Sequence, residues 1–148
     1  MYSWVEKYIG IPFLSGGRTE SGCDCWGFIR LVFKNEYGYE LPVISGDYTN
    51  ALNVSQTKKL FCDMIPIITG EKIKEPEERA IAIISVRNLP CHIGLYAGDD
   101  YIIHSKYGIG VCLEKIESPK RTGTIEGWYR INESYCTTKP IYKADTRI

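Results

Sequence analysis

The sequence predicts an α+β fold in which N-terminal helices pack on a central antiparallel sheet. In the early part of the chain, apolar residues recur three and four positions apart, as at Phe28, Leu31 and Val32, which is the spacing of one helix face. From residue 80 onward, short β-rich runs are separated by turns that contain glycine and aspartate. A block of helices followed by a block of strands indicates the α+β class.

The length and composition predict one domain. A chain of 148 residues with 44% hydrophobic residues can bury a core without disulfides or structural metals. We expect the whole chain, residues 1–148, to form this single domain, with a core over about residues 8–131 and a C-terminal tail over residues 132–148.

The charges and the N-terminus argue against several classes of partner. The 18 Lys and Arg residues balance the 18 Asp and Glu residues, so we expect no nucleic-acid partner. The segment from Met1 to Lys7 lacks the basic start and apolar run of a signal peptide, and no apolar stretch is long enough to cross a bilayer. We therefore expect a protein made in the cytoplasm without a signal peptide and without a membrane partner.

The helical part begins with a short segment from Ser3 to Tyr8, for which Ser3 is the predicted cap. A central helix is predicted over residues 25–37, with Gly38 as its stop. Apolar residues between 51 and 64 predict a further helix.

The second part of the chain predicts a sheet. The polar residues 70–78 predict a connector in front of it. Five strands are expected after this connector, over residues 80–86, 91–97, 101–105, 111–116 and 127–131. The turn Gly98-Asp99-Asp100 joins the second and third of these strands into a hairpin.

Cys25 is the predicted nucleophile. A glycine-bearing loop over residues 15–22 leads into the central helix and places Cys25 at the helix start. The free N–H groups and the helix dipole at this end favour a thiolate, which is the nucleophilic form of cysteine. Because the six cysteines show no disulfide spacing, we expect free thiols, one of which attacks a carbonyl.

A thiol nucleophile needs a base, and the chain has only two histidines, His92 and His104. If a three-residue turn is centred on Asp99, Gly94 faces His104 and both imidazoles lie on the same face of the hairpin. A two-residue turn would place them on opposite faces. In the first register, one imidazole takes the proton of Cys25 and the other orients it, while the Cys25 N–H stabilises the oxyanion.

Each candidate also has a structural interpretation. Buried cysteines are often small apolar residues, and we keep that interpretation for Cys62, Cys91, Cys112 and Cys136. A zinc site would use Cys23, Cys25, Cys91 and His92 as ligands. Because Cys23 and Cys25 are separated by one residue instead of the two that are usual in zinc sites, we expect neither a metal nor another cofactor.

Two neighbours of the thiol have open roles. Trp26 is either a lid against water or part of the core. Asp24 either caps the helix or faces a substrate amine.

Taken together, four segments resemble the NlpC/P60 cysteine peptidases over about residues 8–130; they are Gly16-Gly17, residues 22–28, residues 92–98 and Ile103-His104-Ser105. The resemblance implies a papain-like α+β fold. It also implies hydrolysis of peptide bonds in bacterial cell-wall stem peptides, between D-γ-glutamyl and a diamino acid. It assigns Cys25 as the nucleophile, His92 as the base and His104 as the orienting residue.

The segment from Asp24 to Val32, with Leu41-Pro42 after it, is similar to peptidases of phage tail-assembly proteins and prophages. This similarity implies a tail-associated protein with phage tail proteins and peptidoglycan stem peptides as partners. It also implies that Asp24 meets the free amine of a stem peptide. By position in the family pattern, we expect Asp24, Trp26 and Phe13 to contact substrate. Trp26 stands where many members carry serine and Phe13 where many carry an aromatic hydroxyl, so this chain lacks the hydroxyls that contact substrate in those members.

Two other functions fit the same sequence. One is a non-catalytic phage tail protein that keeps the fold and binds a peptide or a partner. The other is an amidase or acyltransferase that shares the three catalytic residues and differs in its substrate.

Overall fold

The structure is a computed structural model that describes residues 1–42, 69–119, 121 and 123–136. The helix predicted over residues 51–64 lies outside these described residues.

Within the described residues, both α-helices lie in the N-terminal part of the chain. Helix α1 spans Val5–Tyr8, and Trp4 occupies its N-cap position instead of the predicted Ser3. Helix α2 spans Cys25–Val32 and continues as the π-helical turn η1, Phe33–Tyr37. The predicted extent of this helix is confirmed, and Gly38 ends it in the left-handed conformation with φ of 73°. Among the described residues, no helix is long and apolar enough to cross a membrane.

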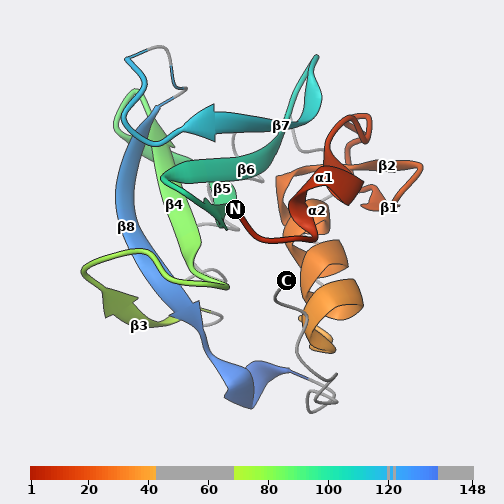
Figure 1. Ribbon diagram of the computed structural model, residues 1–148, viewed down its shortest axis with the longest axis horizontal. Coiled ribbons are helices and arrows are strands. Elements are labelled where there is room, and N and C mark those ends of the chain that lie inside the picture. Colours follow the sequence, from red (N-terminus) through yellow and green to blue (C-terminus); the bar gives the residue numbers. More distant parts are fainter. Residues whose placement is uncertain (43–68, 120, 122, 137–148) are drawn as a thin grey trace.

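Six strands form one antiparallel sheet in the order β3-β8-β4-β5-β6-β7. Their bounds are β3 Thr69–Ile73, β4 Ile81–Val86, β5 Leu89–Gly98, β6 Tyr101–Lys106, β7 Gly110–Lys115 and β8 Thr124–Ile131. Figure 1 shows α1 and α2 together on one side of this sheet. The predicted α+β arrangement, with N-terminal helices packed on an antiparallel sheet, is confirmed.

Several strand boundaries differ from the prediction. Strand β3 occupies the first part of the predicted polar connector, because its pairing with β8 creates a strand that its own polar residues do not signal. Strand β5 begins earlier than residue 91, since Arg87 and Asn88 take left-handed conformations and turn the chain directly out of β4. A small hairpin of β1, Arg18–Thr19, and β2, Gly22–Cys23, lies within the glycine loop.

The C-terminal tail begins with a short 3-10 helix, η3, over Glu133–Tyr135. Its Glu133 accepts a hydrogen bond from the Tyr39 hydroxyl at 2.8 Å. This part of the tail is therefore in contact with the segment that follows η1.

The core has two parts, one on each face of the sheet. The α2 residues Phe28, Ile29 and Val32 are fully buried in the cluster that includes Ile103 of β6. Its neighbour Ile102 belongs to the cluster on the other face, with Ala82, Ile84 and Trp128. Successive strand residues point to opposite faces, so β6 separates the two clusters.

Gly27 allows the glycine loop to lie against α2. A Cβ atom at position 27 would lie 1.9 Å from the Gly17 carbonyl oxygen. We expect Gly27→Ala to lower the free energy of unfolding by about 3 kcal/mol, at the upper end of overpacking costs. The matched Gly70→Ala would place its Cβ 3.5 Å from its neighbours and should change that free energy by less than about 1 kcal/mol. Urea denaturation measures both, and equal losses would contradict the close approach.

Candidate active site

The start of α2 is held by the Asp24 carboxylate. Oδ1 accepts a hydrogen bond from the Gly27 N–H at 2.8 Å, and Oδ2 accepts one from the Gly16 N–H at 2.7 Å. The residue is only 1% exposed. Asp24 is therefore the N-cap of α2 and also fastens the glycine loop, which places Cys25 in the first turn. Its contact with a substrate amine stays a prediction.

The thiol of Cys25 lies against β5. The β5–β6 ladder extends from the turn to the pair Leu95↔Ile103, and before that point β5 pairs with β4 alone. The Tyr96 N–H donates to the Ala80 carbonyl at 3.0 Å and so points toward the β4 side. Backbone N–H groups of successive strand residues point to alternate sides, so the N–H of Ile93, three residues earlier, points away from β4. Hydrogen bonding with the Ile93 backbone lowers the pKa of Cys25, so the sulfur lies beside the residue that follows His92.

The resting thiol is protonated. Burial raises the pKa of Cys25 to about 12, and the Asp24 carboxylate acts in the same direction. Burial lowers the pKa of His92 to about 3, with His104 and Lys106 adding to the shift. The expectation of a favoured thiolate is therefore not met in the resting protein, because burial and then the Asp24 charge raise the pKa of Cys25.

Five of the cysteines lie in the part of the chain that the structure describes. All five are free thiols, as predicted; they are Cys23, Cys25, Cys91, Cys112 and Cys136.

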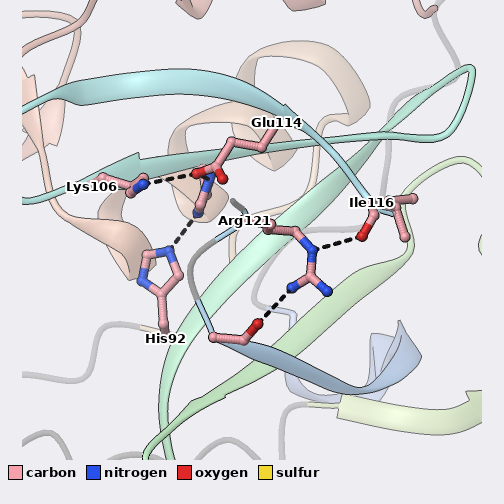
Figure 2. A network of polar contacts seen from close by, with 7 residues as sticks. His92, Lys106, Glu114, Ile116 and Arg121 are labelled. Carbon is pink, nitrogen blue, oxygen red and sulfur yellow. Dashed lines mark hydrogen bonds and ion pairs between the residues drawn. The ribbon is translucent and has the colours of Figure 1, made fainter. Parts of the chain in front are cut away.

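The two imidazoles are in direct contact. His92 Nε2 lies 2.7 Å from His104 Nδ1, and a dashed line in Figure 2 joins His92 to its partner. Gly94 lies between them on the same face, where a Cβ atom would be 2.6 Å from Ile102 Cδ1 and 3.5 Å from His104 Cβ. A side chain at position 94 would therefore crowd Ile102 and lie against His104. The predicted placement on one face is confirmed.

The hairpin has the predicted register but a different turn. Leu95 pairs with Ile103, which is the register centred on Asp99. The turn contains two residues, Asp99 and Asp100, with φ of 51° and 64°. A bulge at Ala97 adds one residue to β5 and restores the register that a two-residue turn alone would shift.

His104 also contacts a carboxylate that the sequence analysis missed. His104 Nε2 lies 2.8 Å from Glu114 Oε1, and Lys106 Nζ lies 2.9 Å from the same oxygen (Figure 2). His104 itself is fully buried. The turn around Gly108 could have predicted this contact. It joins β6 to β7 in a register that pairs His104 with Cys112, and Glu114 lies two residues beyond Cys112 on the same face of the sheet.

Among the described residues, one group of side chains could hold a metal ion, and it includes His104 and Glu114. His104, Cys112 and Glu114 hold ligand atoms within 4.8 Å of one another. Both His104 nitrogens already have partners, and the Lys106 ammonium occupies the Glu114 oxygen. A cation would have to displace these contacts, so the geometry favours a hydrogen-bonded chain over a metal centre.

Ser105 connects the imidazole strand to the nucleophile segment. Its hydroxyl donates to the Cys23 carbonyl at 2.8 Å, across 82 positions of sequence, and both residues are buried. Since Ser105 follows His104 and Cys23 lies two residues before Cys25, this bond fixes the two parts of the site relative to each other. Sequence analysis did not identify it, because it depends on packing between distant elements.

The remaining predicted substrate residues are Trp26, which follows the thiol in the chain, and Phe13, which pairs with Cys23. Trp26 is 1% exposed and belongs to the core cluster, which supports its structural interpretation over a lid. Phe13 is half-buried, forms a bridge with Cys23, and packs edge-on against the Tyr107 ring at 5.6 Å. Contacts of Phe13 and Trp26 with substrate stay predictions.

Comparison with known proteins identifies relatives of this arrangement. The profile of the NlpC/P60 family matches residues 10–125. The murein DD-endopeptidase MepS/murein LD-carboxypeptidase of Escherichia coli K12 is 23% identical over 111 residues, which cover 74% of this chain and 50% of that protein. The gamma-D-glutamyl-L-lysine dipeptidyl-peptidase of Bacillus subtilis is 29% identical over 98 residues, covering 66% and 28%. The chain thus spans half or less of the length of these relatives.

A solved structure shows the same fold. The crystal structure of an NlpC/P60 family protein from Bacillus cereus superimposes with a TM-score of 0.59 at 20% identity, over 84% of this chain and 37% of that one. The papain-like α+β fold expected from the sequence is confirmed.

The protonated resting thiol predicts how alkylation depends on pH. Because its pKa is raised to about 12, the thiolate fraction of Cys25 should grow about tenfold per pH unit from about pH 6 to about pH 9. The iodoacetamide rate at Cys25, followed by mass spectrometry, should rise without a plateau over this range. Cys25→Ser supplies the background. A plateau at neutral pH would reveal a preformed thiolate–imidazolium pair and contradict this description.

Proposed function

The chain belongs to the NlpC/P60 family, and on that premise we propose that it is a cysteine peptidase that hydrolyses peptide bonds of bacterial peptidoglycan. The observation that carries the proposal is the position of Cys25 in the first turn of α2, where hydrogen bonding with the Ile93 backbone places its sulfur against β5. The same strand carries His92, whose ring nitrogen lies 2.7 Å from that of His104. The relatives named as a murein endopeptidase and a gamma-D-glutamyl-L-lysine dipeptidyl-peptidase support peptidoglycan as the substrate.

Each residue has a distinct role in the proposed reaction. His92 uses Nε2 for its contact with His104, so Nδ1 is the nitrogen that takes the proton of the Cys25 thiol. As this proton moves, the sulfur attacks the substrate carbonyl carbon, and the N–H at the helix start stabilises the oxyanion. The His92 imidazolium then protonates the leaving amine. Water, deprotonated by His92, hydrolyses the thioester and restores the thiol.

The neutral resting pair suits this sequence of steps. A thiol and an imidazole carry no charge that burial would penalise, and charge develops only when the proton moves. The thiolate that forms is stabilised by hydrogen bonds with the backbone of Ile93 and Trp26, both of which lower the pKa of Cys25. The imidazolium and the thiolate also stabilise each other by charge attraction.

The finer part of the proposal concerns the bond and the substrate contacts. We propose cleavage between D-γ-glutamyl and a diamino acid, which the name of the Bacillus relative supports. Phe13 is the best exposed of the three predicted substrate residues. Asp24 would reach a substrate amine only by accepting a further hydrogen bond beside its two backbone donors.

We further propose that residues 1–148 form one catalytic domain with its core over about residues 8–131, and that the protein derives from a phage or prophage, with tail proteins as partners. The support for this origin is the segment from Asp24 to Val32 with Leu41-Pro42 after it.

One observation favours the non-catalytic alternative. The raised pKa of Cys25 is what an unreactive buried thiol would also show. Digestion of peptidoglycan separates the two functions.

The decisive variant is Cys25→Ala. Purified peptidoglycan fragments incubated with the protein should give new peptide termini in mass spectrometry, and the variant should lose at least about a thousandfold in rate because the nucleophile is removed. Circular dichroism should show an intact fold. The matched Cys136→Ala, at the end of η3, removes a thiol outside the site and should keep wild-type rates. Cleavage by Cys25→Ala would refute the assignment, and inactive wild-type protein would favour the binding function.

A further inference from the structure

We propose that Glu114 is a positioning residue that sets the tautomers of both imidazoles, so that His92 presents an unprotonated Nδ1 to Cys25. The inference rests on the proposed function in one respect, namely that His92 serves the Cys25 thiol. It extends the three-residue site to a chain of four groups, because His104 Nε2 lies 2.8 Å from Glu114 Oε1.

The first step is the charge state of Glu114. Its Oε1 lies 2.9 Å from the Lys106 ammonium as well as 2.8 Å from the His104 ring. Burial tends to raise the pKa of this carboxyl, but hydrogen bonds and charge attraction from Lys106 and His104 outweigh burial and leave it lowered. An ionised carboxylate can only accept hydrogen bonds. His104 must therefore carry its proton on Nε2.

The second step passes this constraint along the chain. Burial lowers the pKa of His104, so the ring is neutral and has one N–H, which the carboxylate fixes at Nε2. Nδ1 of His104 is then a lone pair, and its 2.7 Å contact with His92 Nε2 requires His92 to donate. Neutral His92 has no second N–H, so its Nδ1 is a lone pair ready for the thiol proton.

Without the carboxylate, the two rings could also exchange the roles of donor and acceptor and still form one hydrogen bond between them. His104 would carry its proton on Nδ1 and donate to His92 Nε2, and His92 would keep its proton on Nδ1. A ring with N–H at Nδ1 cannot accept the proton of Cys25 there. Only the group at the far end of the chain distinguishes the two arrangements, and that group is Glu114.

The surroundings keep Glu114 in this role. Glu114 and Lys106 lie on adjacent strands, β7 and β6, and their side chains are 16% and 20% exposed, while the His104 side chain is fully buried. Figure 2 shows Lys106 joined to Glu114 by a dashed line, at the end of the network away from His92. The other charged group that acts on His104 is Arg121, which disfavours imidazolium as Lys106 does. Both cations therefore support the neutral state that the argument requires.

Nitrogen NMR of histidine-labelled protein tests the inference without substrate. The chain has two histidines, so only four ring nitrogens contribute. Wild-type protein at neutral pH should show Nδ1 unprotonated and Nε2 protonated in both rings. Glu114→Leu removes the acceptor and should shift at least one ring to mixed tautomers; Glu114→Val serves the same purpose if the leucine variant does not fold. Glu114→Gln keeps an acceptor oxygen and should retain most of the wild-type pattern.

Wild-type tautomers in a folded Glu114→Leu or Glu114→Val variant would overturn the inference, as would wild-type rings protonated at Nδ1. The matched control is Glu126→Gln, which removes an exposed carboxylate on β8 and should leave all four nitrogens unchanged.

Kinetics supply a second readout. Glu114→Leu should lower kcat by about 10- to 100-fold, the loss found when a metal-bound histidine loses the carboxylate that orients it, with KM little changed. Glu114→Gln should recover most of the rate. If wild-type protein cleaves no peptidoglycan, the proposed function fails while the NMR result still decides the role of Glu114. If wild-type protein is active and the Glu114→Leu rate is unchanged, only the inference on Glu114 fails.

Discussion

The site depends on one buried carboxylate. Asp24 accepts hydrogen bonds from Gly16 and Gly27, so a single side chain both begins α2 and fastens the glycine loop across it. A buried charge is tolerated only when hydrogen bonds replace its water, and these backbone donors do so. The same charge lies next to the thiol and opposes its ionisation. The interaction that places the Cys25 thiol therefore also opposes its ionisation, in the same direction as burial.

The imidazoles are held by the sheet rather than by the helix. β5 and β6 bring His92 and His104 together, β7 adds Glu114, and the Ser105 hydroxyl bonded to the Cys23 carbonyl ties this side of the site to the start of α2. A chain of hydrogen bonds that ends in a carboxylate has a direction, because the carboxylate can only accept. The direction of proton transfer that we propose thus depends on the sheet pairing as much as on the histidines themselves.

Local sequence patterns were sufficient to predict part of this candidate site. Cys25 was identified because the glycine loop and the helical spacing of Phe28 and Val32 are contiguous in the chain. The imidazoles were identified because the chain offers only His92 and His104. The predicted register was right although the turn was not, since the bulge at Ala97 compensates for the shorter turn. A bulge has no clear local signal, so this agreement could not have been argued from the turn residues alone.

The sequence by itself therefore determined the fold class, the thiol at the start of α2 and the pair of imidazoles, because each depends on residue type and on spacing within one element. Only the tertiary structure decided the partner of His104, the bond from Ser105 to Cys23, the strand at Thr69–Ile73 and the protonation of Cys25. These features arise from pairing and burial between segments far apart in the chain. Strand pairing brought Glu114 to His104, and removal of water raised the pKa of a thiol that the helix dipole alone would have lowered.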